Sequence, residues 1–130
     1  MINKILNKEV ELHLDWCSYE EAKYAVEHWH YSRAMPAGKL IKIGVWENGK
    51  FIGCIIFGNG ANNNIGSPYG LKQTEVCELV RVALKEHKIP VTKILKIAIN
   101  ILKKLNAEIK LIVSYADSKE GHLGKIYQAG

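Results

Sequence analysis

The segment from residue 76 to 115 constrains the fold most, because a long amphipathic helix lies between two apolar strands. Pro90 favours a helix start, and the helix predicted over Val91–Leu105 carries apolar side chains on more than half of its circumference. A helix with so broad an apolar face packs against a sheet. The flanking runs, Val76–Leu84 and Ile109–Tyr115, are short and rich in apolar and β-branched residues, which is typical of buried strands. This strand–helix–strand unit predicts two parallel strands joined by a right-handed crossover.

The N-terminal third predicts a half-buried strand followed by a helix. Apolar and polar residues alternate from Val10 to Trp16, as in a strand with one face on the core. The segment Ser18–Glu21 is a capping box, which predicts the start of a helix. We expect that helix to end near Arg33, because Pro36 follows soon after.

A hairpin and a short C-terminal helix complete the predicted order. The apolar runs Leu40–Trp46 and Phe51–Phe57 flank the pair Asn48–Gly49, which favours the positive φ angles of a tight hairpin turn. A final short helix is expected to carry Tyr127. The sequence thus predicts one domain over residues 1–130, an α/β (α+β) mixed β-sheet with helices on both faces in the order β-α-β-β-β-α-β-α.

Composition and cysteine usage narrow the class of protein. A hydrophobic content of 48% against 24% charged residues excludes an intrinsically disordered chain. Cys17, Cys54 and Cys77 are odd in number and far apart, which indicates reduced thiols rather than a disulfide framework. With no apolar signal core, a cytoplasmic location is expected. The net charge of +5 is compatible with nucleic acid as a partner but is also common in enzymes.

Several separated sequence blocks resemble known families. The order of strands and helices looks like the GNAT acyltransferase fold over nearly the whole chain. More narrowly, a set of blocks in the same order resembles the phage-encoded Mom DNA-modification proteins: His28–Arg33, Pro36–Lys39, Cys77–Arg81, Ser114–Asp117 and Gly124–Gly130. The resemblance implies a transferase that places a methylcarbamoyl group on the exocyclic amine of adenine in phage DNA, which protects that DNA from host restriction. It implies double-stranded DNA and a small-molecule group donor as partners.

The chain departs from the GNAT pattern at two places. GNAT enzymes bind the coenzyme A pyrophosphate at a glycine-containing loop before the central helix. The corresponding segment, Glu86–Thr92, has no glycine, and Pro90 lacks an N–H group, which argues against acyl-coenzyme A as the donor. GNAT domains also continue past the glycine that matches Gly130. We therefore expect a fold that is short at its C-terminus and leaves an open strand edge, through which the chain could form a homodimer.

The required chemistry indicates which residues could act. A flipped adenine needs an aromatic platform, a base for its amine proton and donors for developing charge. The catalytic residues we predict are His30, Tyr31, Arg81, Asp117 and Tyr127. In this set Asp117 or His30 is the base, Arg81 and Tyr127 are electrophilic partners, and Tyr31 is a stacking platform. The predicted substrate-binding residues are Arg33, Lys39, Tyr69, Ser114 and Tyr115.

For several of these residues the sequence also allows a purely structural role. His30 could be a satisfied structural histidine, and His28 reads as a surface residue. Glu78 and Arg81 are an odd number apart, so a regular strand would point them to opposite faces, and Glu78 is expected in a structural ion pair. A metal held by His30 and Asp117 is a further alternative for the cofactor, which the sequence leaves unknown. The rival functions are a GNAT N-acyltransferase acting on a small amine or protein, and a non-catalytic DNA-binding module.

Overall fold

The computed structural model describes residues 3–6, 10–58, 70, 75–114 and 125–128, with the backbone alone at 3–6 and 125–128. Its elements in chain order are β1 (Asn3–Leu6), β2 (Glu11–Trp16), α1 (Tyr19–Trp29), β3 (Leu40–Glu47), β4 (Lys50–Gly58), β5 (Val76–Leu84), α2 (Val91–Leu105), β6 (Leu111–Ser114) and β7 (Lys125–Gln128). The strands form one seven-stranded sheet in which sequence neighbours are also sheet neighbours. All pairs are antiparallel except β5 and β6, which are parallel and connected through α2. The predicted mixed sheet and its strand–helix–strand unit are confirmed.

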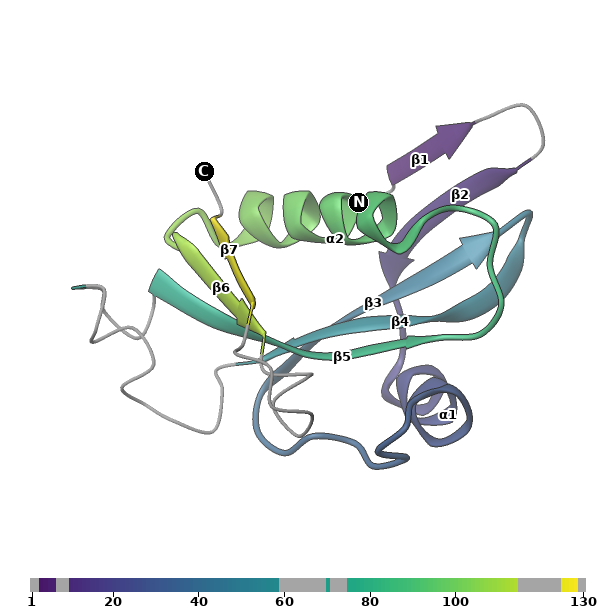
Figure 1. The fold of residues 1–130 in the computed structure, drawn as a ribbon, viewed down its shortest axis with the longest axis horizontal. Coiled ribbons are helices and arrows are strands. Elements are labelled where there is room, and N and C mark those ends of the chain that lie inside the picture. The colour runs from purple at the N-terminus through teal and green to yellow at the C-terminus, as the bar shows by residue number, and fades with distance from the viewer. Residues whose placement is uncertain (1–2, 7–9, 59–69, 71–74, 115–124, 129–130) are drawn as a thin grey trace.

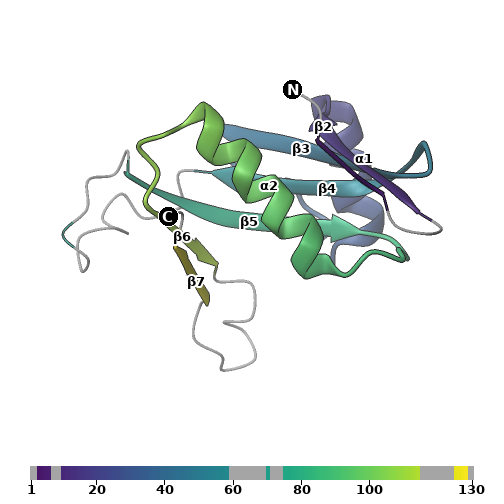
Figure 2. The same ribbon diagram turned by 90° about the horizontal axis from the view of Figure 1, so that it is seen from above.

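The two helices cover opposite faces of the sheet (Figure 1 and Figure 2). We call the face under α2 the α2 face; there Ile94 and Ile101 join the main core with sheet residues such as Leu14. We call the other the α1 face; there Val26 of α1 packs with Ile56 of β4. The prediction of helices on both faces is therefore confirmed.

The helix α1 begins as predicted but ends earlier. The Ser18 hydroxyl accepts from the Glu21 backbone N–H at 3.0 Å, and the Glu21 carboxylate accepts from the Ser18 N–H at 2.9 Å, which is the predicted capping box. The last helical residue is Trp29, and His30 is extended with φ −113° and ψ 140°. Arg33 lies one turn beyond the helix, in a tight turn with φ 53°. The expected helix end near Arg33 was therefore wrong by about one turn of 3.6 residues.

The hairpin between β3 and β4 forms where it was predicted. Asn48 and Gly49 have φ angles of 51° and 79°, as a type I′ turn requires. The Asn48 side-chain oxygen also accepts from the backbone N–H of Glu11 at 2.8 Å, and the Asn48 N–H donates to the Glu11 carbonyl at 2.8 Å. The turn is thereby fixed to the neighbouring strand β2.

The C-terminal segment forms a strand where a helix was expected. Tyr127 lies in β7, antiparallel to β6 and opposite Ile112. Isoleucine and tyrosine favour strands, and a single isolated helical turn has little stability of its own, so pairing with β6 is preferred. The strand β7 covers the edge of β6 that was expected to be open, and β7 is itself the last strand of the described sheet, so a homodimer formed through this edge stays a prediction. The strand β1, which pairs with β2, was not predicted.

A β-bulge in β5 changes which face its charged residues share. Ile56 is opposite Arg81 and Phe57 is opposite Leu79, so Val80 is the extra residue. Leu79 belongs to the α2-face core, whereas Val80 packs on the α1 face. The bulge therefore places Glu78 and Arg81 on the same face, the α1 face, and the prediction of opposite faces was wrong.

Candidate functional site

A pocket opens on the α1 face at the point where β5 and β6 stop pairing. The parallel pairing ends at Leu79 opposite Ser114, although β5 continues to Leu84. The pocket has a volume of about 170 Å³, and we call it the His30 pocket. It is lined by Trp29, His30, Tyr31, Leu79, Val80, Arg81, Val82 and Ser114. Its position beyond the end of β6 agrees with the general location of sites in sheets that contain parallel strands.

His30 is buried at the C-terminal end of α1, with 8% of its surface exposed. Its Nδ1 atom lies 2.7 Å from the Ser32 hydroxyl and accepts from the Ser32 backbone N–H at 3.1 Å. Burial lowers the pKa of His30 below its ordinary value, and the positive charge of Arg81 lowers this pKa further. The imidazole is therefore held in its neutral form at physiological pH.

Arg81 is fixed by backbone carbonyls that lie beside the pocket. Its Nε donates to the Ala34 carbonyl at 3.1 Å, and its Nη1 donates to the Val80 carbonyl at 2.9 Å. The Ala34 N–H donates in turn to the Ser32 hydroxyl at 3.3 Å. Arg81 and His30 are thus both hydrogen-bonded to the short segment 32–34, which orients both side chains.

Two aromatic rings, those of Trp29 and Tyr31, line the pocket on one side. Tyr31 is 66% exposed, and its ring centroid lies 4.3 Å from that of His30 with an interplanar angle of 30°. Trp29 also lines the pocket, and the Lys85 ammonium lies 5.7 Å from the centre of its ring. An exposed ring beside this pocket provides a surface on which a planar base can stack.

The structure brings together four of the predicted site residues, His30, Tyr31, Arg81 and Ser114. Arg33 is exposed, and its backbone N–H donates to the His30 carbonyl at 3.1 Å. Tyr69, Tyr115 and Asp117 lie outside the described residues, and Tyr127 is described by its backbone alone.

Lys39 lies at a second cavity, of about 350 Å³, on the α2 face. That cavity lies between the C-terminal end of α2 and the sheet, where Leu102 and Phe57 contribute to its lining. Lys39 is therefore separated from the His30 pocket by the sheet.

Sequence reasoning missed Ser32, which contacts His30 both by its hydroxyl and by its backbone N–H. The available signal was its position in a turn directly after a predicted helix, because serine there often forms local hydrogen bonds to side chains and backbone. The β-bulge at Val80 left no comparable signal, since the run around it reads as a regular strand.

Cysteine chemistry is disfavoured at the described site. Burial raises the pKa of Cys77 to about 12, with a further contribution from the charge of Glu78. Burial also raises the pKa of Cys54 to about 12. All three cysteines are free, as predicted, but a buried thiol with so high a pKa is a poor nucleophile.

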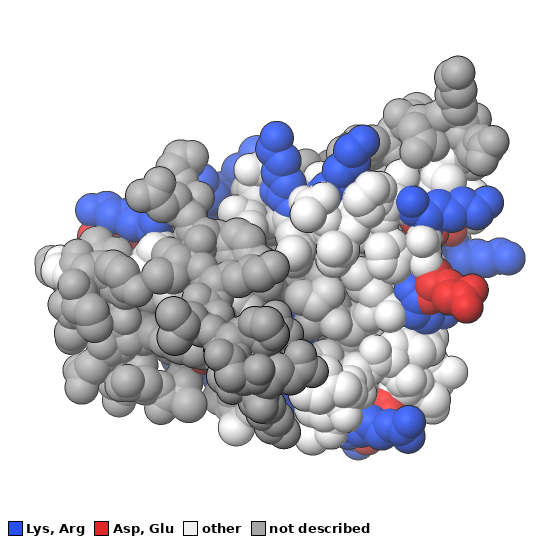
Figure 3. Space-filling view, in the orientation of Figure 1, with Lys and Arg blue, Asp and Glu red and all other residues white. Residues whose placement is uncertain are grey.

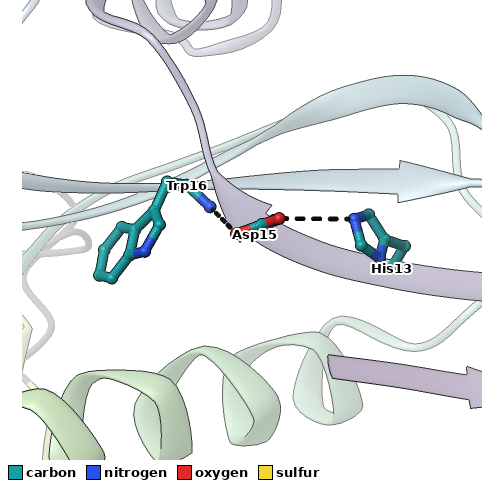
Figure 4. A network of polar contacts seen from close by, with 3 residues as sticks. All are labelled: His13, Asp15 and Trp16. Atoms are coloured by element: carbon teal, nitrogen blue, oxygen red, sulfur yellow. Dashed lines mark hydrogen bonds and ion pairs between the residues drawn. The ribbon is translucent and has the colours of Figure 1, made fainter. Parts of the chain in front are cut away.

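A second polar cluster lies on β2 (Figure 4), and none of its residues lines the His30 pocket. The His13 Nε2 atom lies 3.9 Å from the Asp15 carboxylate, which also accepts from the Trp16 backbone N–H at 2.8 Å. The His13 ring lies against Trp46 with centroids 5.5 Å apart. Among the described residues, no three His, Cys, Asp or Glu side chains are grouped so that they could hold a metal ion.

Backbone N–H groups in the segment before α2 are hydrogen-bonded to a carboxylate of the chain itself. Glu47, at the end of β3, accepts from the backbone N–H groups of Lys88 and Ile89, each at 2.9 Å. Pro90, the N-cap of α2, has no N–H to offer. The N–H groups of Lys88 and Ile89, which directly precede this helix and its N-cap, therefore already bind an internal anion.

None of the helices in the described part of the chain is long and apolar enough to cross a membrane. The sequence model of the Mom protein family matches residues 11–130, which is nearly the whole chain. A search of curated proteins found no match.

Proposed function

The chain belongs to the Mom protein family, which acts in phage DNA modification, and we propose that it transfers a methylcarbamoyl group to the exocyclic amine of adenine in double-stranded DNA. The modification would protect phage DNA from host restriction. The observation that carries this proposal is the pocket in which the buried side chain of His30 and the half-buried side chain of Arg81 are held by hydrogen bonds to the same segment, 32–34, beside the exposed ring of Tyr31.

Adenine must leave the duplex before its amine can react. Its amine lone pair is delocalised into the ring and is hydrogen-bonded within the helix, so the base has to be flipped out and held. We assign the holding of the flipped base to Tyr31, because its exposed ring lies at the rim of the His30 pocket.

The transfer forms a bond between the amine nitrogen and a carbon of the donated group. The bond from that carbon to the leaving group breaks, and the leaving group keeps the electron pair. The amine proton passes to a base, for which Asp117 is our candidate. Arg81 stabilises negative charge that develops on the donor, because its guanidinium has five donors and the two carbonyl bonds hold its plane in place.

The volume of the pocket limits the size of the group donor that it can enclose. A volume of about 170 Å³ is below the range of about 300–1,000 Å³ that is typical for sites enclosing drug-sized ligands. The His30 pocket suits the reacting group and one planar ring rather than a whole nucleotide cofactor. Together with the carboxylate of Glu47 at the start of α2, this disfavours the rival function of a coenzyme A-dependent N-acyltransferase.

Nucleoside mass spectrometry tests the proposal directly. DNA from bacteria expressing the chain is digested to nucleosides and compared with DNA from cells that express an Arg81→Gln variant at the same level. We expect a heavier adenine nucleoside with the wild-type chain and its loss with the variant. Only unmodified adenine in cells that contain abundant folded wild-type protein would contradict the proposal and favour a non-catalytic DNA-binding module.

A further inference from the structure

The contacts of Ser32 determine which nitrogen of His30 carries the proton. The proton of a neutral imidazole is assigned from the hydrogen bonds that its two nitrogens make. The Ser32 backbone N–H points at Nδ1 at 3.1 Å, and a backbone N–H can only donate. Nδ1 must therefore accept, and the proton of the neutral ring resides on Nε2.

The Ser32 hydroxyl is consistent with the same assignment. The hydroxyl oxygen lies 2.7 Å from Nδ1 and accepts a hydrogen bond from the Ala34 N–H at 3.3 Å. With Nδ1 as acceptor, the hydroxyl proton points at Nδ1, which is closer than its other acceptor, the Ala34 carbonyl oxygen at 3.4 Å, while the hydroxyl oxygen accepts from the Ala34 N–H. If Nδ1 carried a proton instead, that proton and the Ser32 backbone proton would face each other.

We propose that Ser32 is a positioning residue that fixes His30 as a hydrogen-bond donor through Nε2, so that His30 polarises the carbonyl of the transferred group and is not the base. This inference rests on the proposed function. A neutral imidazole can serve as an electrophilic donor of this kind. A base at Nε2 would need a lone pair there, which this tautomer lacks. The amine proton then goes to a different group, and Asp117 is the predicted one.

Burial and Arg81 keep the ring in the state that this role requires. An imidazolium would place protons on both nitrogens and would lose the acceptor that Ser32 faces. Because burial and the nearby guanidinium both disfavour the cation and lower the pKa of His30, the neutral donor form prevails at physiological pH.

The tautomer can be measured without any activity. Long-range ¹⁵N–¹H correlation spectra of the full chain, labelled at histidine, distinguish a bare ring nitrogen from a protonated one, and a His30→Gln variant identifies the signals of His30. We expect a bare Nδ1 and a protonated Nε2 at a pH where His30 is neutral. A protonated Nδ1 would overturn the inference, whether or not the protein modifies DNA.

Ser32 variants separate positioning from folding. In Ser32→Ala the hydroxyl is lost and only the backbone N–H favours the tautomer, so we expect a detectable population of the Nδ1-protonated form. The rate constant for adenine modification should fall about fivefold, the size expected for one lost hydrogen bond, with KM for DNA unchanged.

Ser32→Thr keeps the hydroxyl and should retain the wild-type tautomer and rate. An unchanged tautomer and rate in Ser32→Ala would overturn the role of the hydroxyl, and a correct tautomer without modified adenine would overturn only the proposed function.

Discussion

At the scale of single residues, the site depends on the planar fork of Arg81. Its Nε and Nη1 reach two different carbonyls, those of Ala34 and Val80, and a lysine ammonium cannot reproduce that geometry. We expect Arg81→Lys to fold but to modify adenine at least about a hundredfold more slowly, as is usual when an oriented donor is removed. Modified adenine quantified over time by mass spectrometry provides the measurement. Near wild-type rates in this variant would show that charge alone, without the fork, is sufficient.

The charge of Arg81 also affects the protonation of His30. Burial and Arg81 both lower the pKa of His30, so the folded state binds this proton less readily than the unfolded state does. The stability that follows is present above the unfolded pKa of about 6.5 and is lost as pH falls through the folded pKa. In Arg81→Gln one of the two causes is removed, and we expect the pKa of His30 to rise.

An NMR pH titration of the His30 ring in wild-type and Arg81→Gln proteins measures this change. Modification activity of the wild-type chain should also decline as pH falls through the same pKa, because the imidazolium replaces the neutral donor. An unchanged or lower pKa of His30 in Arg81→Gln would contradict the assigned electrostatic contact.

At the scale of elements, the central pair β4–β5 depends on a residue without a side chain. Gly53 has φ 144°, and a Cβ placed there would lie 1.9 Å from the Ala83 carbonyl oxygen in β5. Because that atom belongs to a backbone held in the sheet, it cannot move aside cheaply. We expect Gly53→Ala to destabilise the fold by about 3 kcal/mol or more, at the upper end of single-substitution effects.

Gly49 provides the matched control. It also has a positive φ, 79°, but nothing lies within 4 Å of an added Cβ. Gly49→Ala should therefore cost only about 1 kcal/mol, from backbone strain alone. Urea unfolding of the two variants gives both free energies, and equal losses would contradict the close approach at Gly53.

The start of α2 provides a test of the rival function. The Glu47 carboxylate binds the N–H groups of Lys88 and Ile89, in the segment directly before α2 that corresponds to the pyrophosphate-binding loop of GNAT enzymes. We expect calorimetry of the wild-type chain with acetyl-coenzyme A to show no binding. Glu47→Gln keeps the shape but weakens the charge-assisted bonds, and it should destabilise the fold by about 1 kcal/mol. Micromolar binding to the wild-type chain would instead favour an acyltransferase.

The elements predicted from sequence are those with a strong periodic or turn signal. The α2 helix, its parallel flanking strands, the capping box at Ser18 and the turn at Asn48–Gly49 each carry such a signal, and all are confirmed. The four-residue strands β1 and β7 are too short to show a period. The bulge at Val80 arises from the pairing of β5 with β4, which local sequence does not encode. This bulge is the reason that Arg81 and His30 share a pocket.

At the scale of the whole molecule, the sheet separates two basic regions. Lysine side chains project above α2 (Figure 3), and the exposed ones on this helix include Lys93, Lys96 and Lys104. The His30 pocket opens on the α1 face instead, where Arg33 and Lys85 are exposed. We therefore expect a duplex that delivers a base to His30 to contact Arg33 and Lys85 rather than the lysines of α2.

This separation predicts which cations bind DNA productively. Replacing Arg33 and Lys85 by glutamine should weaken duplex binding about tenfold or more near physiological salt. The slope of log K against log salt concentration should decrease in magnitude by roughly 2, because each lost phosphate contact contributes about 0.9 to that slope. Replacing Lys93, Lys96 and Lys104 by glutamine removes more charge but should change the modification rate by less than about twofold, because these side chains are screened from a ligand on the other face. Fluorescence anisotropy over a series of salt concentrations measures binding, and mass spectrometry measures modification. The opposite result would be loss of DNA binding and modification in the variant with three substitutions on α2, with both retained in the variant with substitutions at Arg33 and Lys85. In that case the DNA would lie on α2, and the His30 pocket could not be the place where adenine reacts.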